Sequence, residues 1–138
     1  MATINDFNQS LIEEFRTNDG KLSGNFEGSP LLLLTTTGAK TGRTHTTPIV
    51  YLRDGEQVFV FASKGGAPTH PAWYHNLVAN PEVTVELPGD RFGARAVVLE
   101  GAERDRVFDR QKALMPNFAE YESKTTRLIP VIALERIA

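Results

Sequence analysis

The sequence predicts a mainly β fold with flanking helices: a small barrel of about six antiparallel strands. Apolar and β-branched runs are separated by turn residues, and Asp54-Gly55 and Pro88-Gly89-Asp90 mark two hairpins. Amphipathic helical patterns occur at the N-terminus, between the hairpins and near the C-terminus. Hairpin connections make the sheet antiparallel, and six such strands that share an apolar face curl into a barrel.

Residues 1–20 are expected to form an N-terminal amphipathic helix that ends at Gly20. Its apolar stripe has spacings of three and four residues and consists of Ile4, Phe7, Leu11 and Phe15. We favour a helix docked on the core, and the alternative is a mobile helix that covers a pocket or touches a membrane. Because Arg16 is the only cation on the polar face, attraction to anionic lipids would be weak.

The strands are expected to follow a polar linker at 20–30. In the third of them, Val58, Val60 and Ala62 alternate with Phe59 and Phe61, which predicts two apolar faces. Pro130 in the last strand predicts an edge or a bulge. The expected strands are 31–37, 46–55, 56–64, the two arms of the hairpin 82–101, and 127–137.

Three further segments are expected to be helical or partly so. Pro71 suits the first turn of a short helix at 70–80, which Asn80-Pro81 stops. A helix at 102–115 would turn Val107, Phe108 and Leu114 inward, and 116–126 is a short helix or a loop. Since no repeat or boundary is evident, residues 1–138 are expected to form one domain.

Composition excludes several classes of function. The longest apolar run, Leu31 to Leu34, is too short to span a bilayer. The first 20 residues are acidic rather than basic, so we expect a cytoplasmic protein without a signal peptide. The absence of cysteine excludes disulfides, thiolate metal sites and a cysteine nucleophile. A net charge of -2, from 15 basic and 17 acidic residues, argues against a nucleic-acid partner.

A cationic loop follows the first strand, in the segment 35–48. Lys40, Arg43 and His45 stand close to Gly38 and Gly42 with almost no acid nearby, although no P-loop or Rossmann spacing is present. Glycine permits close backbone approach, successive N–H groups can form a nest, and Lys40 adds a charge, all of which suit an anion. A plain solvated turn explains this loop equally well.

A second cluster favours the anion. The third strand also ends in a hydroxyl, a cation and two glycines, at 63–66, and a helix start follows that can attract anions. Trp73 and Tyr74 offer flat apolar surface for a ring system, and Asn76 can hydrogen-bond a ring edge. The alternative role of Trp73 is plain core packing, which is the more common one.

No metal site or nucleophile is expected. His70 and His75 are five residues apart, which does not place them on one helix face, and no third ligand is evident. The serines and threonines lie in polar loops without a G-x-S-x-G context. A surface for an anionic, planar molecule without a side-chain nucleophile is typical of an enzyme that uses a cofactor.

Three segments, 35–55, 62–87 and 127–136, resemble the deazaflavin-dependent nitroreductase family of actinobacteria. The pairing of TTTG-x-K-[ST]-G with ASKGG and P-x-WY-x-N is specific, and the resemblance covers about residues 30–136. It implies a split β-barrel related to flavin-mononucleotide-binding barrels. It also implies coenzyme F-420, an 8-hydroxy-5-deazaflavin with a phospholactyl–oligoglutamate tail. Members pass hydride to quinones, nitroimidazoles and other electron-poor acceptors.

The resemblance assigns cofactor-binding residues. Those for the tail are Ala39, Lys40, Thr41 and His45, joined by Arg43 because Ala39 and His45 replace arginines that are common in the family. Those for the deazaflavin ring are Phe61, Ala62, Ser63, Lys64, Ala72, Trp73, Tyr74, His75, Asn76 and Phe118.

The substrate side departs from the family pattern. Val50, Met115 and Phe118 stand where tyrosines occur in some members, while Tyr121 remains. Apolar walls suit a quinone better than a nitroimidazole, and the N-terminal stripe would add an apolar lid. Ser63 is the candidate donor to the cofactor ring or the substrate oxygen, and Tyr121 is a weaker candidate proton donor.

We therefore predict a coenzyme F-420-dependent oxidoreductase that reduces a small-molecule quinone or nitro-type acceptor without a metal. The alternatives are a flavin-mononucleotide-dependent reductase on the same barrel and a non-catalytic carrier of deazaflavin or a lipophilic ligand. A homodimer with a shared active site and a peripheral contact at the inner face of the membrane are both left open.

Overall fold

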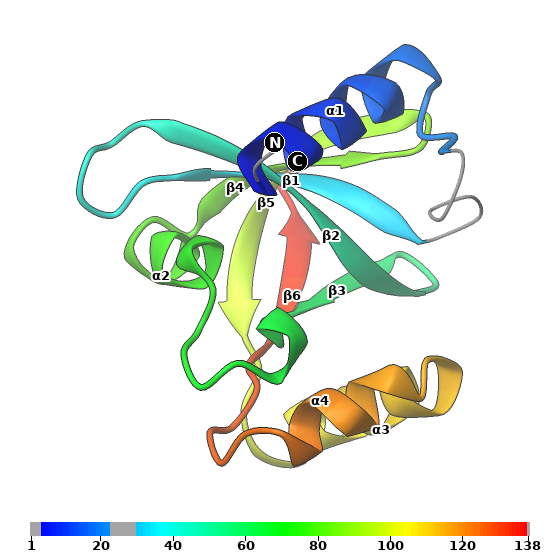
Figure 1. Ribbon diagram of the computed structural model, residues 1–138, viewed down its shortest axis with the longest axis vertical. Helices are drawn as coiled ribbons and strands as arrows, with labels where there is room; N and C mark the ends of the chain where they lie inside the picture. The colour runs from blue at the N-terminus through cyan, green and yellow to red at the C-terminus, as the bar shows by residue number, and fades with distance from the viewer. Residues whose placement is uncertain (1–3, 23–29, 138) are drawn as a thin grey trace.

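The computed structural model describes residues 4–22 and 30–137, with side chains from Asn8 onward. Its six strands form one closed barrel in the order β1-β2-β3-β6-β5-β4, and every neighbouring pair is antiparallel. This confirms the predicted antiparallel barrel (Figure 1). The strands are β1 (Leu31–Thr37), β2 (Thr44–Asp54), β3 (Gln57–Phe61), β4 (Glu82–Leu87), β5 (Asp90–Val98) and β6 (Val131–Arg136).

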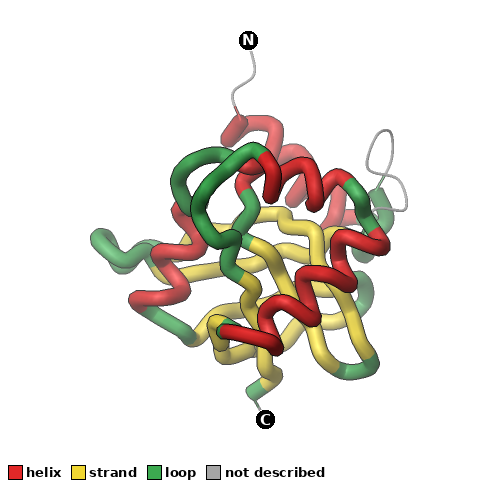
Figure 2. The backbone as a smooth tube through the Cα atoms, turned by 90° about the horizontal axis from the view of Figure 1, so that it is seen from below, coloured by secondary structure: helices red, strands yellow, loops and turns green. Residues whose placement is uncertain are grey.

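The helices lie around the outside of the strands (Figure 2). In the view of Figure 1, α1 lies at the opposite end of the molecule from α3 and α4. The α-helices are α1 (Ile4–Thr17), α2 (Ala72–Ala79), α3 (Gly101–Leu114) and α4 (Asn117–Ser123), and η2 (Lys64–Gly66) is a short 3₁₀ turn. None of the helices in the described ranges is long and apolar enough to cross a membrane.

Both faces of β1 are buried, which explains its run of four leucines. Leu32 and Leu34 pack in the barrel interior, in the same apolar cluster as Val60 of β3. Leu31 and Leu33 point outward and are covered by Ile12 and Phe15 of α1. Because successive side chains of a strand alternate between its faces, only a strand covered on both sides can bury four leucines in sequence.

The docked position of α1 is confirmed. Ile12 and Phe15 are each only 4% exposed, and Leu11 is half-buried against the same cluster. Arg16 donates two hydrogen bonds to the carboxylate of Glu86 on β4, at 3.1 and 2.8 Å. The side chains of Ile4 and Phe7, which belong to the predicted stripe, lie outside the described part.

A second apolar cluster lies between the barrel and the α3–α4 pair. Phe59 and Phe61 face it, while Val58 and Val60 face the barrel interior, so the predicted alternation along the third strand is confirmed. Phe108 of α3 and Phe118 of α4 each make an edge-to-face contact with Phe61, at 6.0 and 5.7 Å between ring centroids.

Two sequence expectations are wrong. Leu114 does not point inward: it is 62% exposed, because it ends α3 beyond the contact with the barrel, and buried Gln111 holds the inward position one turn earlier. Pro130 marks neither an edge nor a bulge. It precedes β6, which lies between β3 and β5, and its carbonyl accepts a hydrogen bond from the Ala62 N–H at 3.0 Å.

Candidate functional site

A cavity of about 930 Å³ opens between four segments: the β1–β2 loop, the start of β2, the first turn of α2 and the N-terminal half of α1. The barrel brings these segments together because α2 packs beside β1, whose C-terminal end carries the loop. The lining residues that the sequence predicted are Ala39, Lys40, Thr41, His45, Ala72, Trp73, His75 and Asn76. Gly38, a glycine that the sequence singled out in the cationic loop, lines the cavity too, whereas Asn8, Gln9, Ile12, Thr46 and Thr47 were not predicted.

The loop at 38–43 folds back on itself and leaves two N–H groups unused. Gly38 N–H donates to the Arg43 carbonyl at 2.7 Å, and Gly42 N–H donates to the Gly38 carbonyl at 3.0 Å. Within the described residues, the backbone N–H groups of Lys40 and Thr41 have no hydrogen-bond acceptor. Adjacent free N–H groups in a tight loop are the arrangement that binds anions.

Gly38 lies in a tight position. A Cβ at this position would lie 2.9 Å from Thr41 Oγ1 and 3.2 Å from both His45 Nε2 and the Arg43 carbonyl oxygen. The side chains of Thr41 and His45 therefore close over the glycine backbone and would have to shift to make room for a larger residue.

Asn76 fixes this loop to α2. Its Oδ1 accepts a hydrogen bond from the Ala39 N–H at 3.1 Å, and its Nδ2 donates to Thr36 Oγ1 at 3.4 Å. The sequence suggested that this amide bonds a ring edge, whereas in the structure it joins the first turn of α2 to the end of β1. The two clusters that the sequence singled out are thus in direct contact.

The cavity is electropositive. Its described lining contains Lys40 and His45 but no aspartate or glutamate, and Arg43 lies exposed in the same loop. Neither Lys40 nor Arg43 makes an ion pair with any described side chain. Cations without a protein partner are available to an anionic ligand.

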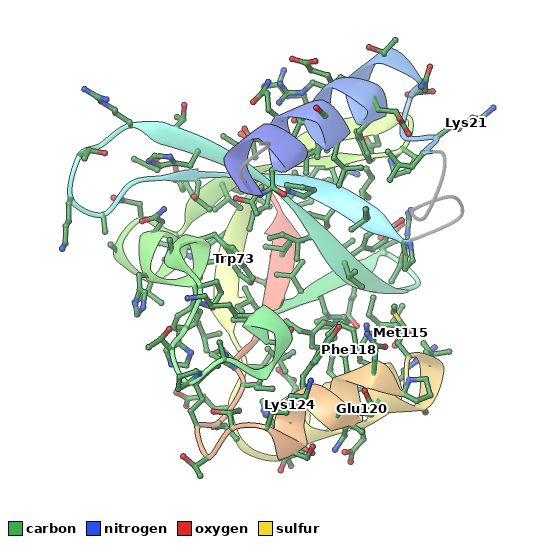
Figure 3. The ribbon with its side chains drawn as sticks, in the orientation of Figure 1. Lys21, Trp73, Met115, Phe118, Glu120 and Lys124 are labelled. Carbon is green, nitrogen blue, oxygen red and sulfur yellow. The ribbon has the colours of Figure 1, made fainter. Side chains whose placement is uncertain are left out.

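Trp73 serves both roles considered for it. It is half-buried, packs against the interior apolar cluster of the barrel, and also lines the cavity. Figure 3 shows it on the α2 side of the barrel, apart from Met115 and Phe118 beside α4. An indole held in this way gives a flat apolar surface beside the cationic loop.

The remaining predicted residues do not line this cavity. Phe118 is 4% exposed and packs between Phe61 and Tyr121, with ring centroids at 5.7 and 5.2 Å. The phenolic oxygen of Tyr121 accepts a hydrogen bond from Asn117 Nδ2 at 2.9 Å. Five of the predicted residues pack in the apolar cluster beside α3 and α4: Val50, Phe61, Met115, Phe118 and Tyr121.

The segment after β3 connects the side of the cavity with the apolar cluster beside α3 and α4. Ser63 is 8% exposed, and Lys64 Nζ donates to Thr69 Oγ1 at 3.2 Å. Ala62 packs in the barrel interior, and Tyr74 of α2 packs against the same interior cluster. These predicted residues therefore surround the end of β3 rather than the cavity itself.

Arg127, which sequence reasoning did not identify, holds that segment in place. Its guanidinium donates to the carbonyls of Ala67, Ala62 and Ser63 at 2.9, 3.1 and 2.8 Å, and Nη1 lies 3.0 Å from Nδ1 of His70. Burial lowers the pKa of Arg127. No pattern around Arg127 in the sequence indicates contacts some 60 residues away.

The surroundings of His70 disfavour its protonated form. Burial, followed by the charges of Arg127 and His75, lowers the pKa of His70 below its ordinary value of 6.5. Its ring lies against Tyr74, at 4.7 Å between centroids, and beside His75 at 5.8 Å. Over the described ranges, no group of three or more His, Cys, Asp or Glu residues is placed to hold a metal ion.

Known proteins resemble this chain over most of its length. A family model described as F420H(2)-dependent quinone reductase matches residues 9–136. An F420H(2)-dependent quinone reductase of Mycobacterium tuberculosis is 39% identical over 128 residues, which is 88% of this chain and 85% of that protein.

Two solved structures share the fold. An F420-H2 dependent reductase superposes with a TM-score of 0.71 and 41% identity, covering 77% of this chain and 94% of its own. A chain described as a domain-swapped dimer superposes with a TM-score of 0.74 and 34% identity, covering 96% of this chain and 100% of its own.

Proposed function

Because the chain belongs to the F420H(2)-dependent quinone reductase family, we propose that it binds coenzyme F-420 and reduces a quinone. The observation that carries this proposal is a cavity whose described lining holds no acid and includes both the cationic loop and the indole of Trp73. An anionic tail and a planar ring fit these two walls, and the reduced coenzyme would supply hydride to the acceptor.

The tail would be held by the β1–β2 loop. Lys40 can reach a phosphate with its ammonium group, while the free N–H groups of Lys40 and Thr41 can donate to the same oxygens. Arg43 adds a second cation to the loop, and the His45 side chain lines the cavity beside it. Asn76 keeps this loop at a fixed position relative to α2, where Trp73, His75 and Ala72 would meet the ring.

The protein's contribution to hydride transfer is positional and electrostatic. Donor and acceptor must be held at near-attack distance, and negative charge that appears on the acceptor oxygen must be stabilised. Among the described side chains that line the cavity, His75 and the amides of Asn8 and Gln9 can donate to that oxygen. Ser63 and Tyr121, the candidate donors from the sequence, remain proposed hydrogen-bond or proton donors near the end of β3.

The acceptor wall differs from the apolar lid expected from the sequence. Ile12 and Phe15 are used for docking on the barrel, so the described part of α1 presents mainly the amides of Asn8 and Gln9 to the cavity, beside the edge of Ile12. A quinone suits this combination, because its ring can pack on apolar surface such as that of Trp73 while its carbonyls need hydrogen-bond donors. The substrate-binding candidates from the sequence, Val50, Met115 and Phe118, would contact the acceptor from the apolar cluster beside α3 and α4.

Fluorescence titration of the pure protein with coenzyme F-420 and with flavin mononucleotide tests the cofactor. We expect tighter binding of the deazaflavin, and tighter binding of flavin mononucleotide would overturn the proposal.

Steady-state rates with the reduced coenzyme then test the acceptor: a menaquinone analogue should be reduced faster than a nitroimidazole. Tight binding of the coenzyme without turnover of either acceptor would favour a carrier.

We also propose a homodimer, supported by the similar chain described as a domain-swapped dimer. Light scattering at several protein concentrations tests it, and a monomer mass throughout would reject it.

A membrane contact through α1 receives less support, because Ile12 and Phe15 face the barrel and Arg16 is paired with Glu86. Sedimentation with anionic vesicles tests the membrane contact: protein that sediments with the vesicles would support it, and protein that stays in solution would reject it.

A further inference from the structure

The loop that leaves β3 has an unfavourable backbone. Lys64, Gly65 and Gly66 follow one another with φ values of 48°, 63° and 84°, so three consecutive residues are left-handed. Glycine adopts this conformation freely, but a residue with a side chain such as Lys64 does so at a cost. Such a backbone persists only where its surroundings hold it.

Two contacts hold it. Gly66 packs so closely on α4 that a Cβ there would lie 2.7 Å from the Tyr121 carbonyl oxygen. Arg127, from the segment between α4 and β6, donates to the carbonyls of Ala62 and Ser63 before the turn and of Ala67 after it. The guanidinium thus joins the two ends of the left-handed turn.

The fourth contact of Arg127 is with His70, the residue that leads into α2. Nη1 donates to Nδ1 of His70, so that nitrogen must carry no proton and the neutral ring carries its proton on Nε2. His70 directly precedes Pro71, the N-cap of α2, and its ring lies against Tyr74 and His75. The position of α2, with Trp73 and His75 on it, is therefore coupled to Arg127.

We propose that Arg127 is a positioning residue for the cavity: it fixes the loop at 62–70 and the start of α2, and does so fully only while His70 accepts its hydrogen bond. The proposal rests on the proposed function only in assigning the coenzyme ring to the α2 wall. No acidic side chain pairs with Arg127 within the described residues, so its hydrogen bonds to the loop account for its place in the structure.

The coupling makes the loop sensitive to acid. The groups that face His70 are Arg127, from the segment before β6, and Tyr74 and His75, from α2. Because the pKa of folded His70 lies below 6.5, its contribution to stability is complete above pH 6.5 and is lost as pH falls through the lowered pKa. A protonated ring places a second cation against Arg127 and removes the acceptor.

Hydrogen exchange without coenzyme tests the loop directly. The N–H groups of Gly66 and Ala67 are bonded to the carbonyls of Ser63 and Lys64 at 2.9 and 3.1 Å. In Arg127→Met we expect their protection factors to fall about tenfold or more, the effect of roughly one lost hydrogen bond. Unchanged protection would overturn the proposal.

Arg104→Met is the matched control. Arg104 likewise donates two hydrogen bonds to a backbone carbonyl, that of Ile129, at 3.2 and 2.8 Å, and it does not contact the loop. It differs from the half-buried Arg127 in being buried and in pairing with Asp105. Its loss should leave the Gly66 and Ala67 amides protected. If Arg127→Met fails to fold, Arg127→Lys, which keeps a cation but cannot reach all four acceptors, gives the same comparison.

His70→Asn separates the pH effect from a structural one. The Asn side chain offers an oxygen near the position of Nδ1 that does not titrate between pH 5 and 7. We expect the protection factor of Gly66 to fall between pH 6.5 and 5 in the wild type and to stay level in the variant. The same fall in both proteins would refute the role of His70.

Coenzyme binding completes the test. If the wild type binds coenzyme F-420, Arg127→Met should bind it about tenfold or more weakly, while Arg104→Met binds normally. Equal affinity of wild type and Arg127→Met would overturn the inference and leave the proposed function intact. Failure of the wild type to bind would reject the proposed function, and the exchange data on the free protein would still decide whether Arg127 holds the loop.

Discussion

Replacing Lys40 by glutamine removes one positive charge from the cavity and keeps nearly the same side-chain length. In the free protein Lys40 is exposed and has no hydrogen bond or ion pair with any described residue. We therefore expect the free energy of unfolding of Lys40→Gln to equal that of the wild type within about 0.5 kcal/mol, as for other surface substitutions.

Binding of coenzyme F-420 should change far more. The tail phosphate would lose one charge-assisted hydrogen bond, while the N–H groups of Lys40 and Thr41 remain in place to hold it. Hydrogen bonds to charged groups contribute about 1.5–3 kcal/mol. We thus expect affinity to fall about 10- to 150-fold at low salt. Added salt should weaken the wild type more than the variant, because exposed charges are screened.

Fluorescence titration at two salt concentrations measures this effect. Lys21→Gln is the matched control, since Lys21 is an exposed lysine that does not line the cavity and that Figure 3 shows beyond the far end of α1. The control should bind as the wild type does. Equal affinity of Lys40→Gln and wild type would show that the β1–β2 loop is a simple hairpin turn and that the coenzyme tail lies elsewhere.

Two other predictions concern stability. Gly66→Ala should destabilise the protein by more than about 2 kcal/mol, because it adds a clash with the Tyr121 carbonyl to a left-handed backbone. Gly65→Ala should cost only about 1 kcal/mol, because Gly65 has the same kind of backbone but open space where the Cβ would lie. Urea unfolding compares the two, and equal losses would contradict the contact with α4. Deleting residues 1–18 should cost at least about 3 kcal/mol by exposing Leu31 and Leu33. Asn8→Ala and Gln9→Ala should keep the fold and raise KM for the acceptor, and an unchanged KM would remove α1 from the acceptor wall.

The barrel was predictable because its strands are short, apolar and closed by strong turn residues. Asp54-Gly55 and Pro88-Gly89 fixed two hairpins, and β1 has the predicted bounds of 31–37. The errors have a common cause, which is that a sequence pattern does not show where an element ends. Leu114 lies on the apolar face by periodicity but beyond the contact, and Pro130 lies beside a strand rather than in it.

The site was predictable only where motifs are continuous in sequence. The cationic loop and the start of α2 were both identified, and the structure joins them through Asn76. Arg127 and the polar residues Asn8 and Gln9 were missed because their roles depend on contacts made by distant segments. Arg127 is 60 to 65 residues from the three carbonyls that it binds.

The contacts of Asn76 and Arg127 explain how the site can combine a flexible ligand with a fixed geometry. The anion-binding groups of the β1–β2 loop are exposed, and a long anionic tail can approach them from solvent. The ring wall requires more precise placement, because hydride transfer depends strongly on distance. Two side chains supply it: Asn76 fixes α2 to the cationic loop, and Arg127 fixes the segment that leads into α2. Neither side chain belongs to the cationic loop, so the loss of either should lower the rate of hydride transfer as well as the affinity for the coenzyme, whereas the loss of Lys40 should lower mainly the affinity for the tail.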